Sequence, residues 1–136
     1  MKKTYVNSSK PSQQQLDSLI KLYQDRQYLD AEKLSLSITK EFPKHTLAWK
    51  VLGAILKQKG KISESLIVFQ KSVQLDPQDA KAHNNLAIIL ILQSRLEEAE
   101  TSLRQAIKLK PDLAEAHNNL GVILEKNRKF TEAFSA

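Results

Sequence analysis

The sequence predicts an all-α fold, a solenoid of antiparallel helix hairpins with about 3.5 repeats. Three observations predict it. The segment Ala82-His-Asn-Asn-Leu-Ala87 recurs one period later as Ala116-His-Asn-Asn-Leu-Gly121. Leu75-Asp-Pro77 recurs at the same offset as Leu109-Lys-Pro111, and Phe42-Pro43 stands one such period before Asp76-Pro77. A period of about 34 residues along a chain indicates stacked supersecondary units.

The period divides the chain into frames 12–45, 46–79, 80–113 and a partial frame 114–136, after a flexible basic tail at 1–11. Numbering each frame from one aligns the apolar and small residues. Position 8 holds Leu19, Gly53, Ala87 and Gly121, and position 11 holds Leu22, Leu56, Leu90 and Leu124. Position 20 holds Ala31, Ser65, Ala99 and Ala133, and position 32 holds Pro43, Pro77 and Pro111. Small residues are expected where two helices approach closely, with larger residues filling the gaps between them.

Each full frame is expected to hold two helices of about 13 residues, which are marginal alone and gain burial by stacking. In the second frame the first helix is indicated by the spacing of Trp49, Leu52, Gly53 and Leu56, and the second helix by Ser65, Leu66, Phe69 and Val73. Gly60 separates the two helices, because glycine suits the left-handed conformation that ends a helix. Pro77 ends the second helix, because the residue before a proline avoids the helical region.

The fourth frame is expected to stop about seven residues into its second helix, at Phe130-Thr-Glu-Ala-Phe-Ser-Ala136. Repeat arrays normally close with a polar cap, whereas this segment carries Phe130 and Phe134. Two explanations follow. The chain is a fragment of a longer protein, which we favour because an uncapped apolar end is a solubility liability. Alternatively, Phe130 and Phe134 mediate self-association, and the chain is a homo-oligomer.

The composition narrows the function classes. The 136 residues suffice for one domain, and the longest apolar run, 86–92, is far shorter than the ~20 residues of a membrane span. No apolar segment follows Lys2 and Lys3, so we expect no secretory signal, and the absence of cysteine excludes thiolate chemistry and favours a cytoplasmic location. Half of the net charge of +6 lies in residues 1–11, and no basic stripe indicates nucleic acid.

The pattern resembles the tetratricopeptide repeat family, whose unit of about 34 residues carries a Trp, a Leu-Gly, a later Tyr, an Ala, a Phe and a Pro. The second frame matches through Trp49, Leu52, Gly53, Leu56, Ser65, Phe69 and Pro77, with changes at Leu56 and Ser65. The third matches through His83, Leu86, Ala87, Leu90, Ala99, Leu103 and Pro111. The first keeps Leu19, Leu22, Ala31 and Pro43 but has Gln15 where the aromatic belongs. The resemblance covers residues 12–136 and implies a TPR-like right-handed superhelical solenoid.

The resemblance also implies a concave groove that binds a protein or peptide, either as an extended segment or as an amphipathic helix. The family's groove positions carry over to Leu16, Ile20 and Tyr23, to Lys50, Ala54 and Lys57, to Lys81, Asn84, Asn85, Ile88, Ile91 and Leu92, and to Glu115, Asn118, Asn119, Val122 and Glu125. We predict a non-catalytic scaffold module without cofactor, metal, nucleic acid or membrane partner. Similar arrays often precede a glycosyltransferase or sulfotransferase domain, so an alternative is the substrate-holding arm of a longer transferase.

Asn85 and Asn119 share one groove position and resemble the asparagine ladder in the repeat arm of O-linked N-acetylglucosamine transferases. An amide offers donors and an acceptor, so it can bond a peptide backbone without reading side chains. The alternative is that each Asn bonds its own neighbouring main chain. Likewise Ile88, Ile91, Leu92 and Val122 face either an apolar partner or the core.

Two other functions receive less support from the residues. The carboxylate clamp of chaperone-binding family members would keep Lys50 and Asn85 but is broken at Ala54, Glu115 and Asn119. His83 and His117 recur one repeat apart, about 10 Å between packed helices, which is too far for one metal ion to bridge. We therefore expect both histidines to be packing residues, with His45 in a loop and no catalytic set.

Overall fold

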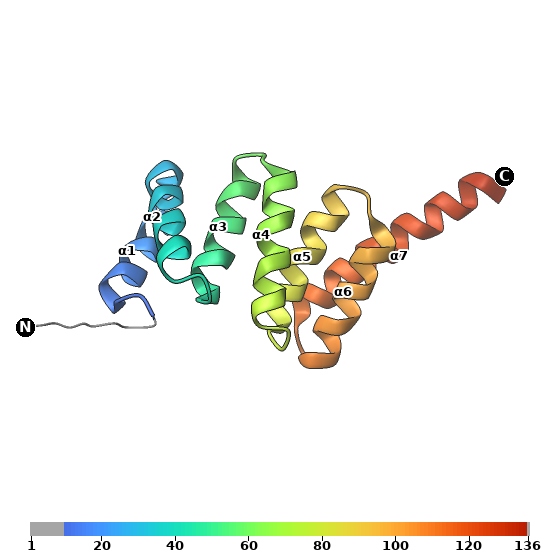
Figure 1. Ribbon diagram of the computed structural model, residues 1–136. Coiled ribbons are helices and arrows are strands. Elements are labelled where there is room, and N and C mark those ends of the chain that lie inside the picture. The colour runs from blue at the N-terminus through green and yellow to red at the C-terminus, as the bar shows by residue number, and fades with distance from the viewer. Residues whose placement is uncertain (1–9, 136) are drawn as a thin grey trace, which may run out of the picture. The chain divides into compact units, whose positions relative to one another are not determined.

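The computed structural model describes residues 10–135, and in this range the chain forms seven helices packed in consecutive hairpins (Figure 1). They are α1 (Gln13–Gln24), α2 (Tyr28–Glu41), α3 (Thr46–Gln58), α4 (Ile62–Leu75), α5 (Ala80–Leu92), α6 (Leu96–Leu109) and α7 (Ala114–Ser135). The prediction of an all-helical, TPR-like fold is confirmed. The predicted tail lies outside the described residues except for Lys10 and Pro11, and Pro11 is buried.

The chain divides into two compact units, Met1–Val68 and Phe69–Ala136, with the division inside α4. In the first unit, Ser12 and Gln15 form a capping box that begins α1. Its core is made of Leu19, Ala31, Ile38, Ala48 and Ile55, all fully buried. A second, smaller cluster joins α3 to the start of α4 through Leu52, Leu56 and Val68.

In the second unit, α5, α6 and the first part of α7 pack together. Asp79 caps α5 by accepting hydrogen bonds from the backbone amides of Lys81 and Ala82. The fully buried residues come from all three helices: Ala82, Ala87 and Ile89 of α5, Ala99, Leu103 and Ala106 of α6, and Ala116 and Ile123 of α7. The small residues let the helices approach, as the sequence pattern predicted.

The turn inside each full hairpin uses a left-handed residue at the same repeat position. Arg26, Gly60 and Ser94 have φ of 61°, 78° and 60°, and each stands one repeat period after the one before it. Gly60 adopts this conformation at little cost because it has no Cβ, whereas the Cβ of Arg26 and of Ser94 strains the same backbone conformation. Packing of the second helix against the first offsets that strain in the other two hairpins.

A ring nitrogen near the start of each following helix donates to the carbonyl of the preceding repeat's proline. Trp49 Nε1 lies 2.9 Å from the Pro43 oxygen, His83 Nε2 lies 2.8 Å from that of Pro77, and His117 Nε2 lies 2.7 Å from that of Pro111. A carbonyl can only accept, so each histidine carries a proton on Nε2. Both histidines thus have a structural contact with the main chain, but it is a hydrogen bond rather than the packing we expected: His83 is half-buried and His117 is exposed.

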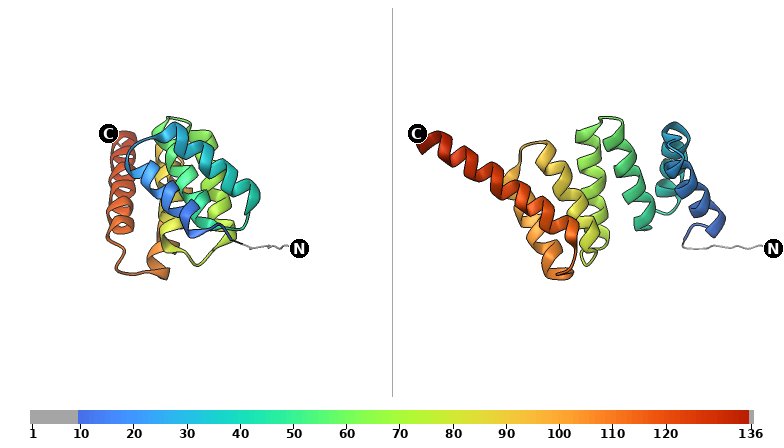
Figure 2. Two further views of the ribbon diagram at one scale, coloured as in Figure 1. Left: turned by 90° about the vertical axis from the view of Figure 1, so that its left-hand side faces the viewer. Right: turned by 180° about the vertical axis from the view of Figure 1, so that it is seen from behind.

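The fourth frame differs from the expectation of a turn followed by a second helix. Helix α7 runs without interruption from Ala114 to Ser135, as Figure 2 shows. Arg128 occupies the turn position but has no positive φ. Its guanidinium instead bonds Glu125 and Glu132, one turn away on either side along the same helix. The described residues after Arg128 do not pack back, so nothing offsets the strain of a left-handed arginine.

Candidate binding groove

The structure brings together several of the predicted groove residues in a hollow on the second unit, which we call the amide hollow. It has a volume of about 310 Å³ and lies between α5 and the start of α7. It is lined by Asn84, Asn85, Ile88, Glu115, Asn118 and Asn119. The equivalent residues of two consecutive repeats thus form its two walls.

The amides of the hollow have different surroundings. Asn84 is buried, with 2% of its surface exposed, and its Oδ1 accepts a hydrogen bond of 2.9 Å from Asn119 Nδ2. Asn85 and Asn119 are half-buried, and Asn118 is exposed. Asn119 is therefore positioned by a side chain of the preceding repeat, an arrangement that neither explanation of the repeated asparagines anticipated. This bond uses one N–H of Asn119 and leaves its Oδ1 and its second N–H for other contacts.

Aliphatic side chains follow the amides along the same two helices. Ile88 is half-buried at the hollow, whereas Leu92 is 57% and Val122 is 44% exposed. Exposure on this scale shows that Leu92 and Val122 are not core residues of the described structure. Ile91 is half-buried and lines a different hollow. The surface is thus amide at one end and aliphatic at the other.

Of the charged residues predicted for the groove on the second unit, Glu115 lines the amide hollow, whereas Lys81 lies elsewhere and Glu125 is paired. Lys81 is exposed and lines a separate hollow of about 410 Å³ together with Asp76, Asp79 and Lys110. Glu125 accepts from Arg128 Nη2 at 2.6 Å, and this hydrogen bond lowers the pKa of its carboxyl. Among the described residues, no lysine or arginine lines the amide hollow, and Glu115 is its charged wall residue.

The remaining groove candidates belong to the first unit. Lys50, Ala54 and Lys57 are half-buried on α3. On α1, Ile20 is exposed, whereas Leu16 and Tyr23 are half-buried. Burial, followed by the proximity of Tyr28, raises the pKa of Tyr23, and the two ring centroids lie 5.7 Å apart. None of these six candidates lines the amide hollow or the hollow at Lys81.

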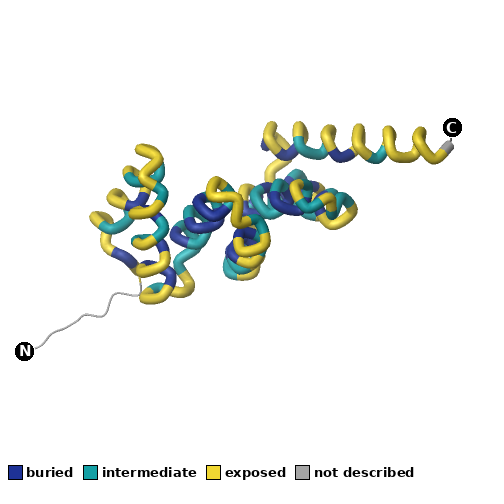
Figure 3. Tube along the Cα trace, turned by 90° about the horizontal axis from the view of Figure 1, so that it is seen from above, coloured by how far each residue is buried: buried dark blue, intermediate teal, exposed yellow. Residues whose placement is uncertain are grey.

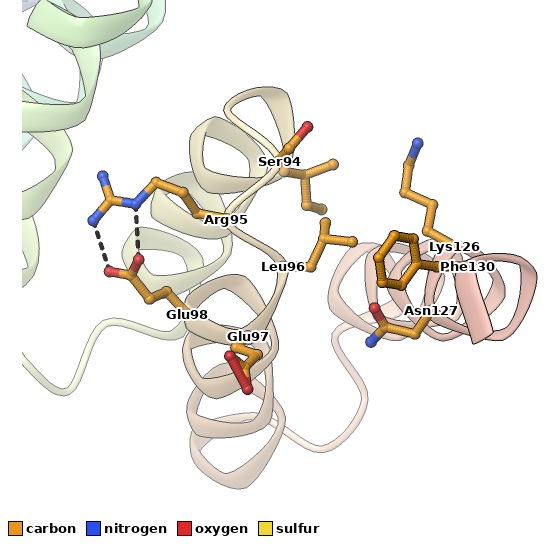
Figure 4. A pocket seen from close by; sticks show the side chains of 9 residues that line it. Ser94, Arg95, Leu96, Glu97, Glu98, Lys126, Asn127 and Phe130 are labelled. Carbon is orange, nitrogen blue, oxygen red and sulfur yellow. Dashed lines mark hydrogen bonds and ion pairs between the residues drawn. The ribbon is translucent and has the colours of Figure 1, made fainter. Parts of the chain in front are cut away.

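A larger hollow, of about 590 Å³, was not predicted (Figure 4). One side of this hollow is formed by the end of α5, the α5–α6 turn and the start of α6. The other side is formed by the middle of α7. The apolar part of its lining comes from Ile91, Leu96 and Phe130. Arg95 donates a bidentate pair of hydrogen bonds to the Glu98 carboxylate, from Nε at 2.8 Å and from Nη2 at 2.7 Å. That contact lowers the pKa of Glu98. Sequence reasoning missed this hollow because its α7 wall, Lys126, Asn127 and Phe130, includes a residue that was expected to lie beyond a turn at Arg128, on a second helix.

The predicted self-association residues are exposed at the far end of α7. Phe130 is 64% and Phe134 is 77% exposed, and the two rings meet edge to face with centroids 4.7 Å apart. Figure 3 shows buried turns in the first half of α7, whereas the described residues of its second half are exposed except for half-buried Asn127.

Two further features bear on the sequence predictions. Within residues 10–135 no three acidic or histidine side chains gather in a way that would hold a metal ion. None of the helices in the described range has the length and apolarity needed to cross a membrane.

Comparison with known proteins identifies the family. Sequence patterns described as tetratricopeptide repeat match residues 20–80 and 68–101, and one described as TPR repeat matches residues 88–127. The chain belongs to the tetratricopeptide repeat family. No curated protein sequence matches it significantly.

Among solved structures, the chain is similar to an O-GlcNAc transferase of Thermobaculum terrenum, with 26% identity and a TM-score of 0.73 over 84% of this chain. The match spans only 23% of the transferase. It is also similar to the type III secretion chaperone SycD of Yersinia enterocolitica in complex with a peptide of the translocator YopD, with 20% identity, a TM-score of 0.78, and 84% and 92% of the two chains covered. The Sgt2 TPR domain of Aspergillus fumigatus gives 16% identity, a TM-score of 0.81, and 97% and 89% coverage. The likenesses to SycD and to the Sgt2 domain show the fold.

Proposed function

We propose that this chain is a non-catalytic scaffold module that binds a peptide segment of a partner protein on the α5–α7 surface. The observation that carries the proposal is the amide hollow, together with exposed Leu92 and Val122, which lie one or two helical turns further along the same two helices. Amides bond a peptide main chain from both sides, since each offers donors and an acceptor. Exposed aliphatic side chains beside them accept apolar groups of the ligand.

The surface favours an extended segment over an amphipathic helix. A helix satisfies its own main-chain groups, so it would leave Asn85, Asn118 and Asn119 without ligand partners at the polar end of the surface. An extended segment presents free N–H and C=O groups to them. The SycD structure, which holds a peptide of YopD on the same fold, supports peptide binding as a use of such an array.

The charge in the wall of the amide hollow predicts which ligand sequences bind best. Glu115 lies in its wall, and no basic side chain of the described residues does. A ligand carboxylate would lose hydration there without gaining a cationic partner. We therefore expect neutral or basic segments to bind better than segments ending in acidic residues, in line with the broken carboxylate clamp.

The proposal is tested in two steps. Pull-down with the chain, followed by mass spectrometry and a peptide array, identifies a segment, and fluorescence anisotropy then measures its affinity. The Asn85→Ala, Asn118→Ala double variant should lose two neutral hydrogen bonds of about 1 kcal/mol each, or roughly thirtyfold in Kd. Lys108→Ala, on the exposed side of α6, is the control. Equal affinity of the double variant and the control would reject this surface as the binding site.

A second candidate function is favoured by the transferase match at 26% identity. In this proposal the array is the substrate-holding arm of a glycosyltransferase-type enzyme. Reading the gene beyond the codon of Ala136 tests it. A stop codon at that point would reject the arm, whereas a transferase domain would support it and leave the peptide-binding surface unchanged.

A further inference from the structure

Helix α2 carries two exposed leucines on one side. Leu29 is 62% and Leu36 is 49% exposed. They stand seven residues apart, so they lie on the same face of the helix. Helix α2 already packs against α1 and α3, its neighbours before and after it in the chain. Those neighbours cover the buried residues Ala31, Ser35, Ile38 and Thr39. The two leucines therefore lie on a face of α2 that no helix of the described residues covers.

The same two repeat positions are polar in the other full repeats. Positions 18 and 25, which hold the two leucines in the first repeat, hold Ser63 and Gln70 in the second and Glu97 and Arg104 in the third. All four polar residues are exposed, including those on α6, although α5 and α7 both pack against that helix. These are thus surface positions even where both neighbours are present. A single exposed leucine is ordinary, but leucine at both positions of one helix indicates a covered surface.

Two lysines accompany the leucines. Lys33 follows Leu29 by one helical turn, Lys40 follows Leu36 in the same way, and both lysines are exposed. Residues four apart on a helix are neighbours on its surface, so the four side chains form one row. Within residues 10–135 neither lysine forms an ion pair. We call Leu29, Lys33, Leu36 and Lys40 the α2 stripe.

The acidic residues of α2 lie off the stripe. Glu32, on the side of the leucines away from the lysines, pairs with Lys59 at the end of α3. Asp30 and Glu41 lie further round the helix, about 60–100° beyond the lysines at about 100° per residue. The stripe is therefore apolar along its middle and positively charged along one edge.

The form of the stripe favours a helix as its occupant. From Leu29 to Lys40 it is about 16 Å long, or roughly three helical turns. It offers no free main-chain groups, so an extended segment would leave its own N–H and C=O groups without partners there. A helix satisfies those groups internally and can place an apolar ridge on the two leucines. Carboxylates on one flank of that ridge would complement the two lysines.

The chain's own first nine residues are a poorer match to the stripe. They contain Lys2 and Lys3 and no aspartate or glutamate. Like charges therefore disfavour them as the occupant, because the lysines of the stripe are not neutralised by ion pairs.

We propose that the α2 stripe docks an amphipathic helix of a partner protein, with aspartate or glutamate along one flank of its apolar ridge. The ridge packs over Leu29 and Leu36, and the carboxylates pair with Lys33 and Lys40. No residue of α2 lines the amide hollow, so the stripe and the proposed peptide-binding surface are separate sites.

A peptide selection on the whole chain tests the proposal. The probe is a phage library of helical peptides of about four turns, with a fixed leucine ridge and Glu, Gln or Lys varied along both flanks. We expect the retained peptides to carry Glu along one flank. Fluorescence anisotropy should show roughly tenfold or weaker binding of these peptides to the Leu29→Gln, Leu36→Gln variant. Glutamine is a good helix former, so α2 keeps its fold.

A matched control and a charge reversal make the test specific. Leu124→Gln removes another exposed leucine, 47% exposed on α7, and should bind like the parent chain. In the Lys33→Glu, Lys40→Glu variant the selection should retain peptides with Lys along the flank instead, and the affinity for the original peptides should fall about tenfold. A purely structural role of the lysines would not produce this reversed preference.

The other outcomes overturn the proposal. Retained peptides with no preference in flank charge, or no retention above that on the leucine variant, would show that the stripe does not dock an acidic helix. If the parent chain binds vesicles of phosphatidylcholine and phosphatidylserine and the leucine variant does not, the stripe contacts a membrane surface instead. If the parent dimerises in sedimentation velocity and the leucine variant does not, the occupant is a second copy of this chain.

Discussion

At the scale of single residues, the groove depends on a side chain that is almost entirely buried. Asn84 is 2% exposed and holds Asn119 in place through a bond between two repeats. The sequence placed Asn84 and Asn85 side by side and repeated them at Asn118 and Asn119, so it predicted the amides. The sequence could not tell which amide is buried and positions another side chain, and which amide is exposed, because that depends on how α5 and α7 pack.

We predict that Asn84 and Asn119 are energetically coupled through their hydrogen bond. Asn119→Ala removes the donor to a buried acceptor and should lower the free energy of unfolding by about 1–3 kcal/mol, and Asn84→Ala by a similar amount. The double variant should cost about 1 kcal/mol less than the sum, since the second change has no bond left to break. Urea unfolding of the four proteins followed by circular dichroism measures this. Strict additivity would show that the bond contributes nothing in solution.

Trp49 offers a second residue-scale prediction. Its ring is half-buried, and its Nε1 donates to the Pro43 carbonyl at 2.9 Å. Trp49→Phe keeps most of the packing and should cost about 1 kcal/mol for the lost hydrogen bond. Trp49→Ala should cost about 2 kcal/mol or more, below the ~3–5 kcal/mol of a fully buried ring because part of this one stays in water. Because Trp49 is the chain's single tryptophan, the unfolding must be followed by circular dichroism rather than fluorescence. Equal costs for the two variants would show that ring packing is unimportant.

At the scale of elements, the turn inside each full hairpin uses the same left-handed backbone conformation, with a different residue in each repeat. Gly60 avoids Cβ strain at φ 78°, whereas Arg26 and Ser94 carry it at 61° and 60°. Because a Cβ on Gly60 would meet no atom within 4 Å, Gly60→Ala isolates the backbone contribution. We expect it to lower the unfolding free energy by about 1–2 kcal/mol, measured by urea denaturation. An unchanged midpoint would mean that the turn relaxes.

The ion pairs of α7 predict a dependence on pH and salt. The hydrogen bond from Arg128 lowers the pKa of Glu125 in the folded chain. A depressed carboxyl pKa stabilises the helix above the unfolded value and loses that contribution as the pH falls through the folded value. Acidification from pH 7 to pH 3 should therefore reduce the helical signal of α7, and Arg128→Gln should show a smaller change. Because the groups are exposed, 0.5 M salt should reduce the difference between the two proteins.

The repeat period predicted most elements because each hairpin is specified locally. Pro43, Pro77 and Pro111 follow the ends of second helices, and Gly60 lies in a turn, as the sequence indicated. The turn near Arg128 was expected by analogy and is absent. Local sequence permits a left-handed arginine, as Arg26 shows, so the outcome depends on whether a second helix packs back. That is a tertiary effect which the residues of the turn do not encode.

At the scale of the whole chain, stability is expected to vary with position. Repeat arrays gain stability from neighbours, so helices with uncovered faces open first. In hydrogen exchange we expect amides of Phe130–Phe134 to exchange within seconds and those around Ala87 and Leu103 to be the slowest of the second unit. Uniform protection along α7 at low concentration would contradict this gradient.

The bonds from ring nitrogens to proline carbonyls have a consequence for how such a chain grows. Each bond crosses the border between one frame and the next, from Trp49, His83 or His117 back to the last proline of the frame before it. A gene duplication of the whole second or third frame copies both partners, the ring that bonds the proline of the frame before it and the proline that accepts from the ring of the frame after it. The joint is thus restored at both ends without any new mutation. Arrays built on this bond lengthen readily in steps of one whole frame, and evolution can adjust reach by copying units before it refines contacts.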